Sequence, residues 1–100
     1  VYDAIVKLGK HINCVHVKDE VGFTNIIQCQ HVWLGAGFVD FKEVARALKD
    51  IDYQGYCAVE WEGWQNGGLA GVGDPGGIGL SDFDMVASES KLFLEEEGFC

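Results

Sequence analysis

Ionisable side chains gather at two points of the sequence, each at the end of a short apolar run. His16, Lys18 and Asp19 close the first run, and Glu60 and Glu62 close the second. Imidazole and carboxylate groups bind divalent metal ions, and a carboxylate also serves as a general acid or base. The same residue types suit a structural histidine that donates to a backbone carbonyl, beside carboxylates in contact with solvent. Which interpretation holds depends on whether the fold brings the two groups together.

The two apolar runs are predicted to be neighbouring parallel strands. Residues 12–17 and 56–62 are mostly apolar, as expected for strands that are buried on both faces. Because side chains alternate along a strand, His16 and Lys18 share one side while Asp19 takes the other. Ligand sites of α/β folds lie at the carboxyl ends of the strands, where these ionisable residues fall.

The clearest helix signal covers residues 41–51. Apolar residues recur there at the i, i+3, i+4 and i+7 positions of one helix face, and they are Phe41, Val44, Ala45 and Leu48. Asp40 is expected to cap this helix, with Glu43 completing an acidic form of the capping box. The segment is therefore predicted to lie on the core.

Two further helices are expected at the ends of the chain. Residues 1–9 have the pattern of a helix end, with Gly9 in the left-handed position that follows it. The last helix is expected to begin after an N-cap at Ser81 and to end at Gly98. Its buried face is predicted to consist of Phe83, Val86, Ala87 and Leu94.

Two long segments are predicted to be loops. Residues 20–39 have no sustained period, and residues 63–80 are rich in glycine. His31 is accordingly expected to be a surface or loop histidine. Gly35 and Gly37 are expected only to turn the chain into the following helix, because a lone G-x-G is weak evidence for a phosphate site.

Composition limits the class of protein. The 100 residues are 48% hydrophobic and 23% charged, which suits a globular chain. A net charge of −9 argues against nucleic-acid binding, and no apolar run reaches the ~20 residues of a membrane span. The four cysteines include no CxxC pair, so we expect unpaired thiols in a reducing compartment, the cytoplasm. Two strands alone cannot form a stable parallel sheet, so we expect this α/β chain to be part of a larger protein or assembly.

Four short motifs in register resemble one protein family. They are VHVKD at 15–19, LGAGFVDF at 34–41, AL at 47–48 followed by YQGY at 53–56, and AVE at 58–60. In this order they resemble the carboxyl-terminal part of the xylose-isomerase-like TIM-barrel superfamily of sugar phosphate isomerases and epimerases. The agreement in spacing, order and element type extends over residues 12–62.

The resemblance implies an α/β fold of the (β/α)8 TIM-barrel type. Residues 1–100 would be its carboxyl-terminal two βα units, strands seven and eight with their helices, and would be incomplete alone. The resemblance also implies that His16 and Glu60 bind one divalent metal ion, Mn²⁺ first, with Mg²⁺, Co²⁺ or Zn²⁺ as alternatives. Glu60 would in addition be the catalytic acid or base on the substrate carbon. The residues expected to bind substrate or to support the metal ligands are Lys18, Asp19, Trp61 and Glu62.

The function that this family implies is a metal-dependent isomerase or epimerase of sugars, sugar phosphates or keto-sugars, which transfers a proton through an enediolate. The expected partners are a small sugar substrate, the rest of the barrel on the same or another chain, and further copies in a homo-oligomer. No nucleic acid and no membrane is expected as a partner.

Two alternatives remain open. The chain could be a non-catalytic acidic half-barrel that assembles with a partner, or a relative of the metal-dependent apurinic-site endonucleases. Those endonucleases usually carry Asn where Lys18 stands and bind DNA through basic loops, so Lys18 and the net charge of −9 disfavour that alternative. Residues 21–23 (VGF) replace the arginine of tagatose-type epimerases, which disfavours their substrate class.

Overall fold

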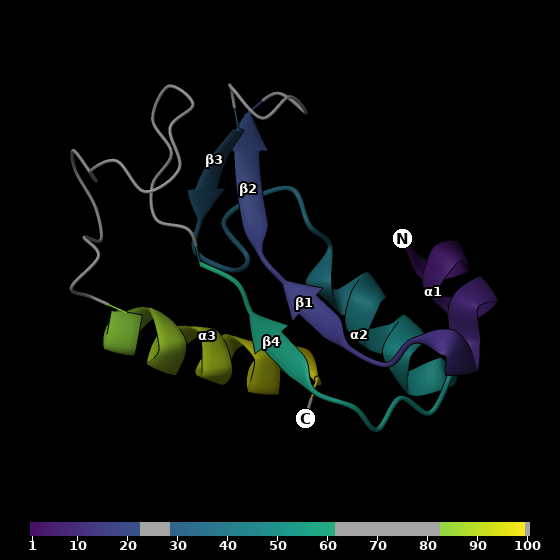
Figure 1. Cartoon of the computed structure of the whole chain (residues 1–100). Coiled ribbons are helices and arrows are strands. Elements are labelled where there is room, and N and C mark those ends of the chain that lie inside the picture. The colour runs from purple at the N-terminus through teal and green to yellow at the C-terminus, as the bar shows by residue number, and fades with distance from the viewer. Residues whose placement is uncertain (23–28, 62–82, 100) are drawn as a thin grey trace.

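A pair of parallel strands joins the two halves of the chain. The computed structural model describes residues 1–22, 29–61 and 83–99 (Figure 1). Strand β1 (Val15–Val17) pairs with β4 (Cys57–Val59), so that His16 lies opposite Ala58. One more hydrogen bond, from Glu60 N to Val17 O at 2.9 Å, extends the pairing past the end of β4. The predicted parallel strands are confirmed, and both are shorter than their apolar runs.

The first helix packs on the second. Helix α1 (Tyr2–Leu8) continues into a 3-10 turn, η1 (Gly9–His11), and Gly9 has the positive φ of 50° that its position predicts. The Tyr2 hydroxyl donates to Asp50 at 2.5 Å, and the Arg46 guanidinium lies 4.7 Å from the centre of the Tyr2 ring. Because the Asp50 carboxylate accepts this hydrogen bond, the pKa of Tyr2 is raised.

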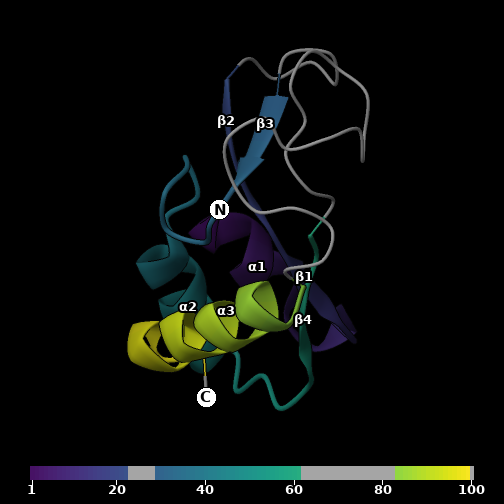
Figure 2. The ribbon, with the colours of Figure 1, turned by 90° about the vertical axis from the view of Figure 1, so that its left-hand side faces the viewer.

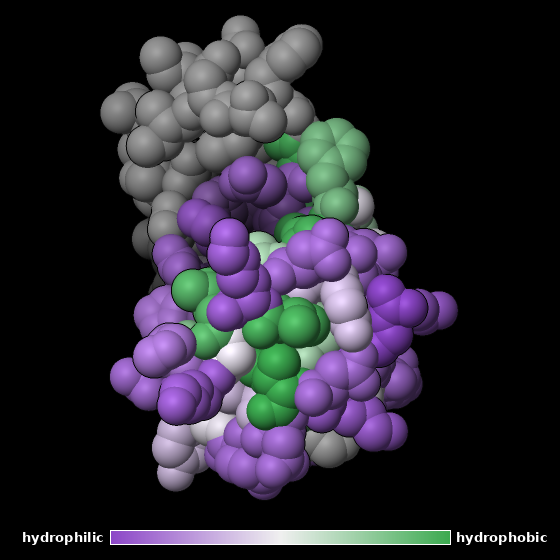
Figure 3. Space-filling model, turned by 90° about the vertical axis from the view of Figure 1, so that its right-hand side faces the viewer, coloured by the Kyte–Doolittle hydropathy of each residue, from purple (hydrophilic) through white to green (hydrophobic). Residues whose placement is uncertain are grey.

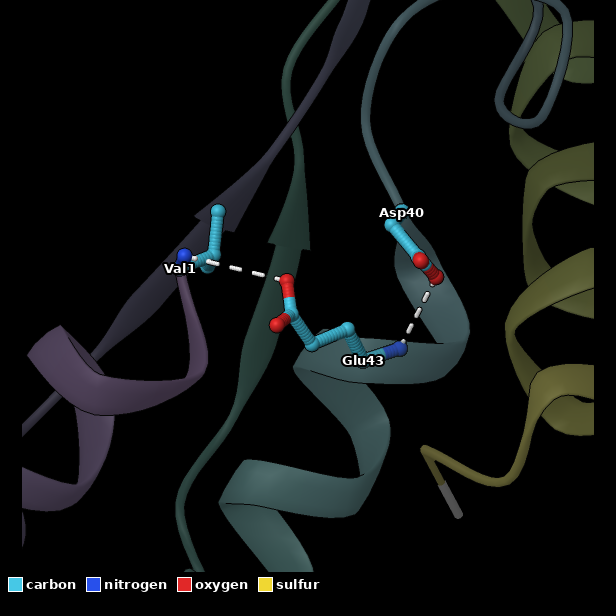
Figure 4. Close-up of polar contacts among 3 residues, drawn as sticks. All are labelled: Val1, Asp40 and Glu43. Carbon is cyan, nitrogen blue, oxygen red and sulfur yellow. Dashed lines mark hydrogen bonds and ion pairs between the residues drawn. The ribbon is translucent and has the colours of Figure 1, made fainter.

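Helix α2 (Phe41–Asp50) begins after the N-cap that its sequence predicts, but the Glu43 carboxylate extends away from Asp40 and does not complete the predicted capping box (Figure 4). Asp40 caps the helix, because its Oδ1 accepts a hydrogen bond from Glu43 N at 3.0 Å. Figure 4 shows that the Glu43 carboxylate extends toward Val1, whose backbone nitrogen lies 3.7 Å from Glu43 Oε2. The predicted apolar stripe is confirmed, since the side chains that α2 buries are Phe41, Val44, Ala45, Ala47 and Leu48.

Helix α3 (Phe83–Glu97) ends in a Schellman motif at Gly98, whose φ is 91°. Phe99 N donates to Leu94 O at 2.9 Å, and Gly98 N donates to Glu95 O at 3.2 Å. The side chains that this helix buries include Val86, Ser90 and Leu94, which recur every four residues. Ala87, predicted to be buried, is exposed because it lies about 100° around the helix from that row. The predicted cap Ser81 and the glycine-rich segment 63–80 lie outside the described residues.

The predicted loop 20–39 is wrong in one respect, because it contains an antiparallel hairpin. Strand β2 (Asp19–Gly22) pairs with β3 (Cys29–Val32), with Glu20 opposite His31. Figures 1 and 2 show this hairpin continuing from β1, away from the helices. His31 is therefore a buried strand residue, 2% exposed, and not a surface or loop histidine.

The core lies on one side of the parallel pair. Val17 contacts Phe41 and Leu94 in a buried cluster, and the Phe41 ring meets Phe93 edge to face at 5.3 Å. Figure 2 shows α2 and α3 on this same side of β1 and β4. The opposite side of the pair, which carries His16, is open among the described residues.

The face around α1 is less well covered. Helix α1 buries none of its side chains, and exposed apolar residues at this end are Val1, Val6 and Leu8. Figure 3, viewed from this side, shows apolar side chains gathered in the middle of a mostly polar face. Of the helices that the structure describes, none is both long and apolar enough to cross a membrane.

Candidate functional site

Three of the predicted site residues meet on the open side of the parallel pair. His16 lies opposite Ala58, and Glu60 follows Ala58 by two residues, so His16 and Glu60 leave the same face. His16 Nδ1 lies 3.6 Å from Glu60 Oε2, and Lys18 Nζ lies 3.9 Å from Glu60 Oε1. The carboxyl ends of the two strands thus bring these side chains together as the sequence predicts.

The geometry of His16 and Glu60 fits two ligands of one metal ion. Donor atoms that lie 2.0–2.2 Å from a metal, at angles of 90–120°, are about 2.8–3.8 Å apart. The distance of 3.6 Å between Nδ1 and Oε2 falls in that range and exceeds an ordinary hydrogen bond. The His16, Lys18 and Glu60 side chains are 63%, 41% and 37% exposed, so solvent or a further part of a protein can reach them.

The described residues supply only part of a metal site. Over residues 1–22, 29–61 and 83–99, no group of three or more His, Cys, Asp or Glu side chains could hold a metal ion. A protein metal site of this kind uses three or four protein ligands. His16 and Glu60 would therefore need partners from outside the described residues.

Asp19 is placed differently from the other predicted site residues. Its side of the strand faces the segment that follows β3, and the residue is 1% exposed. Its carboxylate accepts hydrogen bonds from the backbone N–H groups of Gly35 and Gly37 at 2.9 Å each, Val39 at 3.1 Å and Glu20 at 3.0 Å. The structure brings Asp19 to this turn, and not to the cluster of His16, Lys18 and Glu60.

Gly35 and Gly37 do more than turn the chain, because their backbone N–H groups bind the Asp19 carboxylate. Gly35 has a φ of 88°, which favours glycine, and a Cβ on Gly37 would lie 2.2 Å from Asp19 Oδ1. The sequence contains the residues that form this contact. Asp19 follows the end of the first strand, and the backbone N–H groups of the G-x-G before the helix cap need a hydrogen-bond acceptor. Periodicity alone does not connect Asp19 with the G-x-G.

A methyl group at Gly37 should disturb this contact. Because the Cβ of Gly37→Ala would lie 2.2 Å from Asp19 Oδ1 and 2.5 Å from Glu20 O, we expect a loss of about 1–3 kcal/mol in the free energy of unfolding. Urea unfolding of the full-length polypeptide measures the loss. Ala36→Ser, at the exposed residue between the two glycines, is the control and should stay near wild type. An unfolding midpoint for Gly37→Ala equal to that of the control would contradict the steric argument.

Trp61, predicted to line the pocket, packs against Trp33. Their ring centres are 6.3 Å apart at an interplanar angle of 38°. The Trp61 Nε1–H group is buried, and no acceptor for it is found among the described residues. Glu62, the remaining predicted site residue, lies outside the described residues.

The comparisons with known proteins point to one family. The model of the family described as "Xylose isomerase-like TIM barrel" matches residues 1–76 of the chain. No curated protein and no solved structure matches it. The matched range includes β1 and β4, and both His16 and Glu60.

Proposed function

Since the chain belongs to the xylose isomerase-like TIM barrel family, we propose that it contributes the last two βα units of a barrel whose site isomerises or epimerises a sugar. The observation that carries the proposal is the convergence of His16 and Glu60, from neighbouring parallel strands, on one point. A sugar phosphate or keto-sugar belongs to the same substrate class.

The arrangement of the layers supports the barrel. Helices α2 and α3 cover one side of β1 and β4, while the side with His16 stays open. In a (β/α)8 barrel the helices form the outer ring, the other face of the strands lines the interior, and the site lies at the carboxyl ends of the strands. The open side would then be the interior, where earlier strands complete the set of metal ligands.

A divalent metal, Mn²⁺ by preference, would be held here by His16 and Glu60. When bound, it polarises a carbonyl or hydroxyl oxygen of the substrate. The chain's own residues do the rest. His16 offers the lone pair of Nδ1, and Glu60 can bind through Oε2 while Oε1 takes a proton from the substrate carbon and returns it.

The experiment that tests this function is the uptake of solvent deuterium. The full-length polypeptide that contains this chain is incubated in D₂O with Mn²⁺ and a panel of ketoses, ketose phosphates and 3-keto sugars. Proton transfer through an enediolate should place deuterium on the product carbon, whereas a hydride shift places none there. Cleavage of DNA at an apurinic site, without turnover of any sugar, would favour the endonuclease alternative instead.

Removal of the histidine should weaken metal binding before anything else. Without the Nδ1 donor, we expect His16→Ala to bind Mn²⁺ at least about 100-fold more weakly, and excess Mn²⁺ should restore part of the turnover. Titration of the metal-free protein with Mn²⁺ measures the affinity. His11→Ala removes an exposed histidine of η1 and should bind Mn²⁺ like wild type. Equal Mn²⁺ affinity in the two variants would exclude His16 as a ligand.

A further inference from the structure

The two carboxylate oxygens of Glu60 face different groups. Oε2 lies 3.6 Å from His16 Nδ1, and Oε1 lies 3.9 Å from Lys18 Nζ. We infer that Lys18 is a positioning residue, which holds Oε1 on its own side so that Glu60 binds the metal through Oε2 alone. This inference rests on the proposed function, because it assumes that the metal lies between His16 and Glu60.

The backbone positions explain why one Glu60 oxygen faces His16 and the other faces Lys18. Lys18 directly follows β1 and lies two residues after His16 in extended chain, so the two side chains leave the same face about 6.6 Å apart. Glu60 follows Val59, the partner of Val17 in the parallel pair, and its N–H donates to Val17 O at 2.9 Å, so it lies beside the end of β1. The Glu60 side chain therefore lies between imidazole and ammonium, with one oxygen toward each.

The backbone next to Lys18 is held by the hydrogen bonds of the following residue, Asp19. The buried Asp19 carboxylate is held by four backbone N–H groups, from Glu20, Gly35, Gly37 and Val39. This holds the backbone immediately after Lys18 in place. Lys18 thus adjoins a backbone segment that these hydrogen bonds hold, which supports a positioning role.

Charge explains what the ammonium would do. A carboxylate can bind a metal through one oxygen or through both. If both oxygens of Glu60 bound the metal, Oε1 would leave Lys18, and a dication would move closer to the ammonium. Attraction between Lys18 and Oε1, together with repulsion between Lys18 and the metal, favours binding through Oε2 alone. Oε1 then stays available for the proton.

The test compares Mn²⁺ affinity and turnover in three Lys18 variants of the full-length polypeptide. Lys18→Met and Lys18→Gln remove the cation, so Mn²⁺ alone, without substrate, should bind about five- to tenfold more tightly. Their kcat should fall at least about tenfold, because Oε1 is drawn to the metal. Lys18→Arg keeps the cation and should stay within about threefold of wild type in both measurements.

The matched control is Lys42→Met. It removes an exposed lysine of α2 and changes the net charge by the same single unit, so a general charge effect would appear in it as well. Unchanged or weaker Mn²⁺ binding in both Lys18→Met and Lys18→Gln, or a Lys18→Arg that behaves like them, would overturn the inference while the proposed function stands. A wild-type protein that binds no Mn²⁺ would overturn both.

Discussion

Replacing Asp19 by alanine is expected to lower the free energy of unfolding of the full-length polypeptide by about 3–5 kcal/mol. The carboxylate accepts four backbone hydrogen bonds and is 1% exposed. Alanine leaves these part-buried N–H groups without their acceptor, and each lost acceptor costs about 1–3 kcal/mol where water cannot replace it. Partial entry of water keeps the expected total below the sum of the four.

Asp19→Asn separates charge from shape. The amide keeps one acceptor oxygen, but its NH₂ group faces N–H donors that it cannot satisfy. We therefore expect Asp19→Asn to lose nearly as much stability as Asp19→Ala. Chemical denaturation followed by circular dichroism measures both.

The control is Asp3→Ala, which removes an exposed carboxylate from α1 and should change the stability by less than about 0.5 kcal/mol. If Asp19→Ala were no less stable than Asp3→Ala, the Asp19 hydrogen bonds would not hold the turn in solution. Because Asp19 also adjoins Lys18, the Mn²⁺ affinity of Asp19→Asn reports whether loosening the turn reaches the site.

The sequence pattern was sufficient to predict helix α2, because the residues that start the helix lie next to it in the sequence. The N-cap Asp40 and its hydrogen-bond partner Glu43 are three residues apart in sequence. The apolar stripe from Phe41 to Leu48 is likewise a local pattern. The hairpin could not be predicted in this way. The four residues of β2 include two acidic ones and a glycine, and their strand conformation depends on pairing with β3 across a gap in sequence.

The same difference separates the parts of the site. His16 and Glu60 could be expected to meet, because the carboxyl ends of parallel strands lie at one edge and the alternation fixes the side. Asp19 could be assigned to the other side, but three of its four partners lie sixteen or more residues away in a turn without regular structure. Its role in the structure therefore depends on tertiary contacts that no local pattern contains.

Glu60→Gln is expected to lower the turnover of the sugar substrate by about 10²–10⁴-fold, the range that a positioned general acid or base contributes. The amide has nearly the size of the carboxylate, and its carbonyl oxygen can still face His16 at the Oε2 position. It lacks the negative charge and the basic oxygen that Oε1 presents beside Lys18. The expected loss is therefore in kcat, which steady-state kinetics at saturating Mn²⁺ measures, and deuterium uptake from D₂O should fall in parallel.

The response to metal separates the two proposed functions of Glu60. His16→Ala loses a donor and should recover in part when Mn²⁺ is raised, whereas Glu60→Gln should stay slow with the metal bound, because added Mn²⁺ supplies no base. Glu96→Gln, an exposed position of α3, is the matched control for loss of one carboxylate and should turn over normally. Near-normal turnover by Glu60→Gln with Mn²⁺ bound would show that the proton is carried elsewhere. Glu60 would then be a replaceable ligand, and the division of its two oxygens between His16 and Lys18 would have no catalytic consequence.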